Sequence, residues 1–200
     1  MRKDIVPTKE VTVNGAEFLR VTLGNKDFDL PFKMISGIKV AFLDISGQVD
    51  MIEHTADLLV EELIKRDVHF DTILNPVAKS NALAHAIAVR WAQKVDPSLT
   101  YTVVARKSKG GEHHAVESSY KSVTTTIEQG MYLTDDDVSF IKGKKVLLLD
   151  DVFGGGGTTK ALVDLVNQAG AEVAAHAVVA IEDSPKVPDD LIYLYTLPVH

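Results

Sequence analysis

Two periodicities of hydrophobic residues follow one another along this chain of 200 residues. Residues 51–64 place apolar side chains three and four positions apart with charges between them, which is typical of an amphipathic helix. Residues 81–94 form a second helical segment, rich in alanine, which Asp96-Pro97 closes. By contrast, residues 146–149 form a continuous apolar run, as expected of a strand covered on both faces, and residues 173–181 are predicted to be the next buried strand. Strands that alternate with helices predict a parallel α/β sheet.

The remaining elements are predicted from shorter patterns. Residues 11–13 and 17–23 are separated by Asn14-Gly15, a dipeptide typical of the tight turn of a β-hairpin. Residues 107–119 are polar and are predicted to form an exposed loop. A helix that ends at about residue 167 is expected after the run of glycines and the two threonines that follow it. Further strands or extended segments are predicted at residues 38–45, 72–74, 101–105 and 123–127.

Composition and charge narrow the classes of function. The hydrophobic fraction of 46% and the charged fraction of 24% are those of an ordinary globular domain. The 21 basic and 28 acidic residues leave a net charge of −7, which disfavours a protein that coats nucleic acid. No apolar run is long enough to cross a membrane, no signal peptide is recognisable, and there is no cysteine for a disulfide. We therefore expect a cytoplasmic protein without membrane or nucleic-acid partners.

The most informative stretch joins a buried strand to a helix through an acidic, glycine-rich loop. Asp150 and Asp151 follow the apolar run, four glycines occupy positions 154–157, and Thr158 and Thr159 come next. Glycine lets backbone N–H groups approach an anion closely, and a helix N-terminus offers unpaired donors and a favourable dipole. The carboxylates suit the hydroxyl groups of a sugar instead of a phosphate. The pattern therefore predicts a site for a phosphorylated sugar.

Two other phosphate-binding loops do not fit these residues. The dinucleotide fingerprint Gly-x-Gly-x-x-Gly, counted from Gly154, needs a glycine where Thr159 stands. The Walker loop needs a lysine before its Ser/Thr, whereas Lys160 follows the threonines. The alternative without a ligand is a flexible loop beside a fortuitous pair of acids, and four successive glycines argue against it.

The same residues resemble the motif with which type I phosphoribosyltransferases bind 5-phosphoribosyl-1-pyrophosphate (PRPP): four apolar residues, two acids and a Thr-Gly-Gly-Thr-like loop. In that family the acids bind the ribose hydroxyls and the loop binds the 5′-phosphate. The resemblance therefore assigns the ribose to Asp150 and Asp151. It assigns the phosphate to the loop residues Gly154, Gly155, Gly156, Gly157, Thr158 and Thr159. The family's first loop threonine is Gly155 here, so backbone donors are kept while one hydroxyl is lost.

The resemblance extends from about Val40 to the C-terminus, and it looks closest to adenine phosphoribosyltransferases, with xanthine phosphoribosyltransferases next. Residues 41–45 are similar to a family segment beside the base, and residues 77–80 to the pyrophosphate-binding loop. Residues 105–110 resemble the start of a mobile catalytic loop. The further substrate-binding residues implied by these segments are Phe42, Ala78, Ser80, Lys107 and Lys109.

The resemblance also implies three catalytic residues. Lys79 and Arg106 would stabilise the departing pyrophosphate. Glu128 belongs to a segment that is similar to the family segment whose glutamate lies near the nitrogens of the base, and it would serve in proton transfer to or from the base. Each residue also has a plainer interpretation as a solvated lysine, a surface arginine or an exposed glutamate at a strand end. Phe42 is equally compatible with a place in the core.

The family resemblance implies the remaining expectations. The fold would be the type I phosphoribosyltransferase fold, a parallel α/β sheet with helices on both faces and a small N-terminal β hood. Residues 1–45 would form the hairpin and hood, and residues 46–200 the PRPP-binding core of the same domain. The reaction would transfer 5-phosphoribosyl from PRPP to a purine base in purine salvage, with adenine favoured and xanthine next, and would release pyrophosphate. Mg²⁺ would enter with PRPP, and the protein would be a homodimer without a metal site of its own.

The alternative is a non-catalytic PRPP- or nucleotide-binding regulatory protein of the same fold. It is favoured by departures from the family pattern at Leu43, Lys79, Gln129 and Gly155. Sensors of this fold commonly carry an added DNA-binding segment, whereas the first 40 residues here are predicted to form a hairpin and not a helix-turn-helix. The enzyme is therefore the preferred hypothesis.

Overall fold

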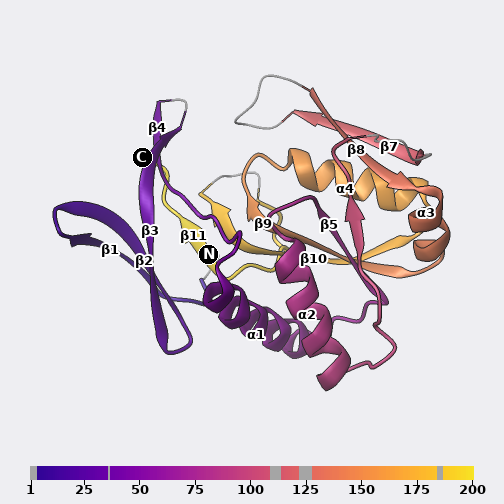
Figure 1. Cartoon of the computed structure of the whole chain (residues 1–200), viewed down its shortest axis with the longest axis horizontal. Helices are drawn as coiled ribbons and strands as arrows, with labels where there is room; N and C mark the ends of the chain where they lie inside the picture. The colour runs from indigo at the N-terminus through magenta and orange to yellow at the C-terminus, as the bar shows by residue number, and fades with distance from the viewer. Residues whose placement is uncertain (1–3, 36, 109–113, 122–127, 184–186) are drawn as a thin grey trace.

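The core of the computed structural model is a five-stranded sheet with the order β11-β10-β9-β5-β6, in which every neighbouring pair is parallel. The structure describes residues 4–35, 37–108, 114–121, 128–183 and 187–200. The strands are β5 (Thr72–Pro76), β6 (Val103–Ala105), β9 (Lys145–Phe153), β10 (Glu172–Glu182) and β11 (Tyr195–Leu197). Helices α1 (Val49–Lys65) and α2 (Asn81–Lys94) cover one face, and α4 (Gly157–Gln168) covers the other (Figure 1). None of the described helices combines the length and hydropathy needed to cross a membrane.

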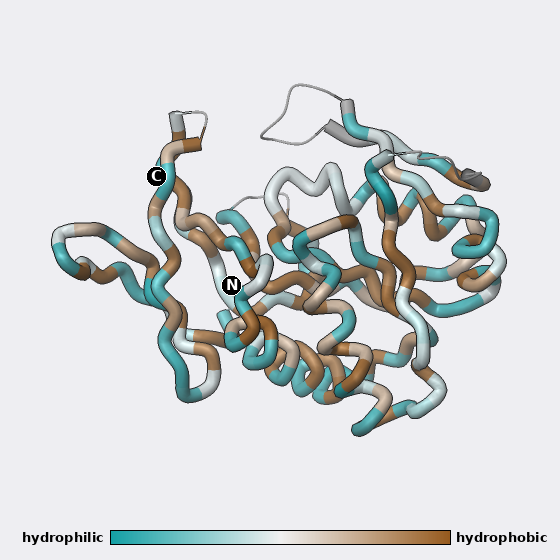
Figure 2. Tube along the Cα trace, viewed as in Figure 1, coloured by the Kyte–Doolittle hydropathy of each residue, from teal (hydrophilic) through white to brown (hydrophobic). Residues whose placement is uncertain are grey.

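Alternate residues of β9 serve two different cores. Leu147 and Leu149 pack with the apolar residues of α1 and α2, whereas Val146 and Leu148 pack with those of α4. All four side chains are fully buried. Successive residues of a strand point to opposite faces, so a continuous apolar run is stable only where both faces are covered. Figure 2 shows the hydrophobic residues concentrated along these central strands. The predicted parallel α/β fold is confirmed.

A second, antiparallel sheet with the order β1-β2-β3-β4 forms the expected hood beside the core (Figure 1). Its strands are β1 (Thr8–Val13), β2 (Ala16–Leu23), β3 (Lys26–Ile35) and β4 (Ile38–Ala41). Asn14 and Gly15 have positive φ angles of 52° and 79°, which make the predicted hairpin turn. The pattern did not predict β3, and the segment predicted at residues 38–45 is a strand only in its first half. His200 and Lys39 exchange backbone hydrogen bonds of 2.9 and 3.1 Å, which join the hood to the C-terminal segment.

A two-stranded sheet corrects the prediction of an exposed loop at residues 107–119, and a short helix follows that sheet. β7 (His114–Lys121) pairs antiparallel with β8 (Glu128–Thr134), and α3 (Asp135–Ile141) follows. A capping box starts α3: the Asp137 N–H donates to Thr134 Oγ1 at 3.2 Å, and the Thr134 N–H donates to Asp137 Oδ2 at 3.1 Å. The loop prediction is therefore wrong from His114 onwards. The strand predicted at residues 123–127 lies outside the described residues.

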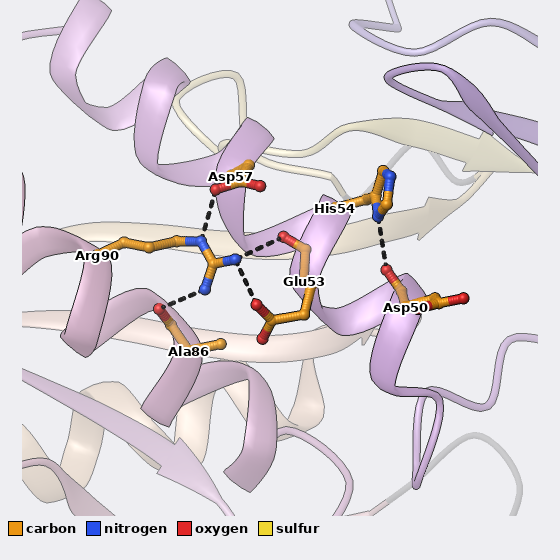
Figure 3. A network of polar contacts seen from close by, with 6 residues as sticks. All are labelled: Asp50, Glu53, His54, Asp57, Ala86 and Arg90. Atoms are coloured by element: carbon orange, nitrogen blue, oxygen red, sulfur yellow. Dashed lines mark hydrogen bonds and ion pairs between the residues drawn. The ribbon is translucent and has the colours of Figure 1, made fainter.

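Arg90 fastens α2 to α1 through a set of charged hydrogen bonds (Figure 3). Its Nε donates to Asp57 Oδ1 at 2.6 Å and its Nη2 donates to Glu53 Oε2 at 2.7 Å, both acids lying on α1. Its Nη1 also donates to the carbonyl of Ala86 at 3.2 Å, within α2. Because α2 begins directly after residues 77–80, this anchor helps to hold that loop at the edge of the sheet.

Candidate functional site

A cleft of about 380 Å³ lies between the hood and the carboxyl ends of the central strands. Such edges of parallel sheets commonly carry binding sites, because the loops after several strands meet there. The lining includes most of the residues that the sequence pointed to, which are Phe42, Ala78, Lys79, Ser80, Lys107, Asp150, Asp151, Gly154, Gly155, Gly156, Gly157, Thr158 and Thr159. The structure therefore gathers the acid pair, the glycine loop and residues 78–80 around one space.

The acid pair lies near the end of β9, where two carboxyl groups adjoin each other and the pKa of Asp150 is raised. The Asp151 N–H donates to Asp150 Oδ1 at 2.8 Å, and the Val152 N–H donates to Asp151 Oδ1 at 2.9 Å. Ser80 Oγ lies 3.4 Å from Asp150 Oδ1. Burial raises the pKa of Asp150 well above its usual range, and the negative charge of Asp151 raises it further. This end of the cleft therefore favours a ligand that brings hydroxyl donors or a cation.

The glycine loop leaves the N-terminus of α4 open toward the same cleft. Gly156 is the N-cap residue with a φ of 79°, a conformation that side-chain-bearing residues rarely adopt, and no side chain caps the helix. The Lys160 N–H makes the first helical bond, to the Gly156 carbonyl at 3.0 Å. The backbone N–H groups of Thr158 and Thr159 precede that bond and have no acceptor within the helix. Together with the helix dipole, these donors suit a phosphate group.

Lys79 projects from the loop between β5 and α2 toward the acid pair. Its Nζ lies 3.8 Å from Asp151 Oδ2 and 5.2 Å from the ring centroid of Phe42. The peptide bond between Val77 and Ala78 in this loop is cis. The lysine side chain is 45% exposed, so its ammonium group remains available to a ligand in the cleft. A cation thus stands between the acids at the end of β9 and the aromatic ring near the hood.

Three other predicted residues are not brought into this arrangement by the described structure. Arg106 is not among the residues that line the cleft, and its Nη1 donates to Asp137 Oδ2 at 3.1 Å, at the start of α3. The side chain of Glu128 and the whole of Lys109 lie outside the described residues. The roles assigned to these residues remain predictions.

Glu182 is a cleft residue that the sequence interpretation missed. It ends β10, next to the strand that carries the acid pair, and it lines the cleft. Its Oε2 lies so close to Gly154 that a β-carbon there would meet it at 2.7 Å. Gln129, noted in the sequence only as a departure from the family, also lines the cleft. A signal for Glu182 did exist: it is the first acid after the apolar run 173–181, in the strand paired with β9.

The pH dependence of stability should reveal the position of Glu182. Burial raises the pKa of this carboxyl above its ordinary value of 4.5. The folded protein then holds a proton that the unfolded chain has released, so this residue destabilises the fold as pH rises from about 4.5 through its folded-state pKa. We expect Glu182→Gln to raise the melting temperature at about pH 7, and the gain should vanish at about pH 4.

Thermal denaturation between these two pH values measures that gain. The control is Glu172→Gln, which makes the same change in charge at the exposed start of β10. A gain for Glu182→Gln that is the same at every pH, or that the control variant matches, would contradict the assignment of a destabilising, half-buried carboxyl.

Comparisons with known proteins agree with the geometry of this cleft. The model of the phosphoribosyl transferase domain matches residues 48–197. The chain is 31% identical over 157 residues to adenine phosphoribosyltransferase of Thermosipho africanus, and the matched segment covers 76% of this chain and 84% of that relative. It is 30% identical over 146 residues to the enzyme of the same name from Mycoplasma mobile, at 72% and 75% coverage. The crystal structure of adenine phosphoribosyltransferase from Thermoanaerobacter pseudethanolicus has the same fold, with a TM-score of 0.65, 22% identity, and coverage of 84% of this chain and 95% of that one. This chain belongs to the phosphoribosyltransferase family.

Proposed function

We propose that the protein transfers 5-phosphoribosyl from PRPP to a ring nitrogen of a purine base, adenine before xanthine, and releases pyrophosphate. The observation that carries this proposal is the single cleft in which Asp150 and Asp151 adjoin the open N-terminus of α4. The acids would accept hydrogen bonds from the ribose hydroxyls, and the backbone N–H groups from Gly155 to Thr159 would bind the 5′-phosphate. A sugar phosphate needs both kinds of partner at neighbouring positions.

Lys79 would act on the leaving group. As the bond from the anomeric carbon to pyrophosphate breaks, positive charge develops on the sugar and negative charge on the departing oxygen, as in other glycosyl transfers. A fixed ammonium group near that oxygen stabilises the transition state more than the bound substrate. Arg106, Lys107 and Lys109 would add positive charge, and Glu128 would manage the proton on the base. These four roles rest on the family pattern.

The acid pair also fits the expected metal ion. Mg²⁺ prefers oxygen ligands and is commonly held by one or two carboxylates together with substrate phosphates. Asp150 and Asp151 offer carboxylate oxygens in the cleft, so a Mg²⁺ ion that enters with PRPP would find suitable ligands. When bound, the ion would supply further neutralisation of the pyrophosphate charge. A homodimer in the cytoplasm remains the expected state of the protein.

The choice of base rests on the names of relatives and on two residues that line the cleft. Adenine phosphoribosyltransferases support adenine, whereas a relative named HGPRTase-like protein 1, from Haloquadratum walsbyi, is 31% identical over 136 residues. Phe42 and Gln129 both line the cleft and offer a ring face and an amide to a purine. An amide both donates and accepts hydrogen bonds, so it is compatible with an amino or an oxo group on the ring.

A panel of bases tests the proposal. Purified protein with PRPP and Mg²⁺ is assayed for pyrophosphate release with adenine, xanthine, hypoxanthine, guanine and uracil. We expect release with adenine at the highest kcat/KM and the matching nucleotide in equal amount. Tight binding of PRPP without release for any base would instead support the non-catalytic regulatory protein.

A further inference from the structure

Three lysines of the hood lie over aromatic rings, and one of them differs from the other two. Lys26 Nζ lies 5.9 Å from the Phe28 centroid and forms an ion pair with Asp50. Lys39 Nζ lies 4.6 Å from the Phe32 centroid and 2.6 Å from Glu17 Oε2.

Lys33 makes the closest of these ring contacts, with its Nζ 3.6 Å from the Phe42 centroid. Within the described part of the chain, no carboxylate lies within 4.0 Å of this ammonium group. A contact with an aromatic face holds a lysine in place without neutralising its charge. Lys33 is therefore a positioned cation whose charge remains available.

The ring under Lys33 belongs to the cleft. Phe42 lines it, and Lys79 Nζ lies over the same ring at 5.2 Å. Both lysines also act on Asp44: the backbone N–H of Ser46 is the main cause of the lowered pKa of this carboxyl, and the charges of Lys79 and Lys33 lower it further. Two cations, one from the core loop and one from β3, therefore lie near the ring of the same cleft residue, and Lys33 adjoins the cleft without being one of the residues that line it.

We infer that Lys33 is a further pyrophosphate-binding residue, so that the hood adds a second cation to the one that Lys79 provides. This inference rests on the proposed function. Pyrophosphate carries several negative charges on two phosphorus centres, and a single lysine is a point charge without the two-pronged geometry of the arginine that the family carries at position 79. A second ammonium group supplies the missing contact. Because no carboxylate pairs with it, no ion pair has to break when the anion binds.

Binding of inorganic pyrophosphate tests this inference directly. Calorimetric titration with pyrophosphate and Mg²⁺ compares the wild type with Lys33→Gln, and with Lys39→Gln as the matched control. Both control and test residues are hood lysines over a ring, but Lys39 is paired with Glu17, and the ring beneath it, Phe32, does not line the cleft. We expect Lys33→Gln to weaken binding about tenfold, as for one lost charged hydrogen bond, and Lys39→Gln to leave it unchanged. Lys33→Arg should restore most of the affinity, which separates a loss of charge from a loss of structure.

The result that would overturn the inference is equal affinity of wild type and Lys33→Gln, equal losses in both glutamine variants, or no binding by the wild type. In turnover, the KM for PRPP should rise in Lys33→Gln while the KM for the base stays the same. A change confined to the base would place Lys33 at an oxygen of the purine instead and would also overturn it. If no base supports turnover, the proposed function fails, and the pyrophosphate titration still decides the role of Lys33.

Discussion

Replacing Asp150 and Asp151 together by asparagine is expected to abolish most of the rise in melting temperature that PRPP with Mg²⁺ gives to the wild type. A ligand that binds only the folded state stabilises it by mass action, by about 2.7 kcal/mol at about 100 times Kd. For a domain of this size that corresponds to a rise of roughly 5 to 10 °C. The carboxylates are the proposed acceptors for both ribose hydroxyls, and an amide is a weaker acceptor than a carboxylate.

The same double variant should be more stable than the wild type without ligand. Burial and the charge of Asp151 raise the pKa of Asp150, so ionisation of this carboxyl destabilises the folded protein. The destabilisation begins as the pH rises above 3.8, the ordinary pKa of an aspartate. It grows until the pH passes the folded-state pKa of Asp150. At neutral pH the asparagine variant has no carboxyl to ionise at this position, so it lacks this destabilisation. Stability and substrate binding would thus change in opposite directions, which loss of fold does not produce.

Differential scanning fluorimetry with and without PRPP and Mg²⁺ measures both effects. The control is the double change of Asp189 and Asp190 to asparagine, which removes the same charge from exposed residues that do not line the cleft. An undiminished PRPP shift in the Asp150/Asp151 variant would refute the assignment of these acids to the ribose.

The unit made of β9, the glycine loop and α4 could be predicted because its signals are local. A continuous apolar run, two acids and four glycines are adjacent in sequence, and each limits the backbone on its own. The hood was predicted less completely. Pro31 lies within β3, and a proline within a run of residues argues against a strand there. Residues 115–119 of β7 alternate between exposed and half-buried positions, with little apolar signal.

The site was predictable only where it is made of that local unit or of residues in the family pattern. Glu182 enters through the pairing of β10 with β9, and Lys33 through the packing of β3 against Phe42. The first contact joins segments far apart in the sequence, so the acid after the apolar run indicates a site only once the strand order is known. Lys33 and Phe42 are close in the sequence, but the register of β3 with β4, which brings them together, was not predicted. Arg106 shows the opposite case, in which a sequence pattern assigned a residue to the site. Its sequence context indicated that it binds phosphate, whereas in the structure it donates to Asp137, in a helix that the pattern did not predict.

Lys79→Ala should lower kcat by about tenfold or more, with a smaller effect on the affinity for PRPP. The negative charge on the leaving pyrophosphate grows only as the bond breaks, so a residue that serves it stabilises the transition state more than the bound substrate. The ammonium group also lies 3.8 Å from Asp151, and its removal takes this positive charge away from the carboxylate. A modest loss of PRPP affinity would follow from this second effect. Lys94→Ala, at the far end of the helix α2 that follows this loop, is the control.

Arginine at position 79 separates these contributions. It keeps the charge beside Asp151 and restores the residue that the family carries, so Lys79→Arg should preserve kcat or raise it, provided that the loop accommodates the larger head group. Single-turnover rates of pyrophosphate release, with PRPP affinities measured separately by calorimetry, distinguish the two steps. If Lys79→Ala weakened PRPP binding and left the single-turnover rate unchanged, Lys79 would serve binding of the substrate and not departure of its leaving group.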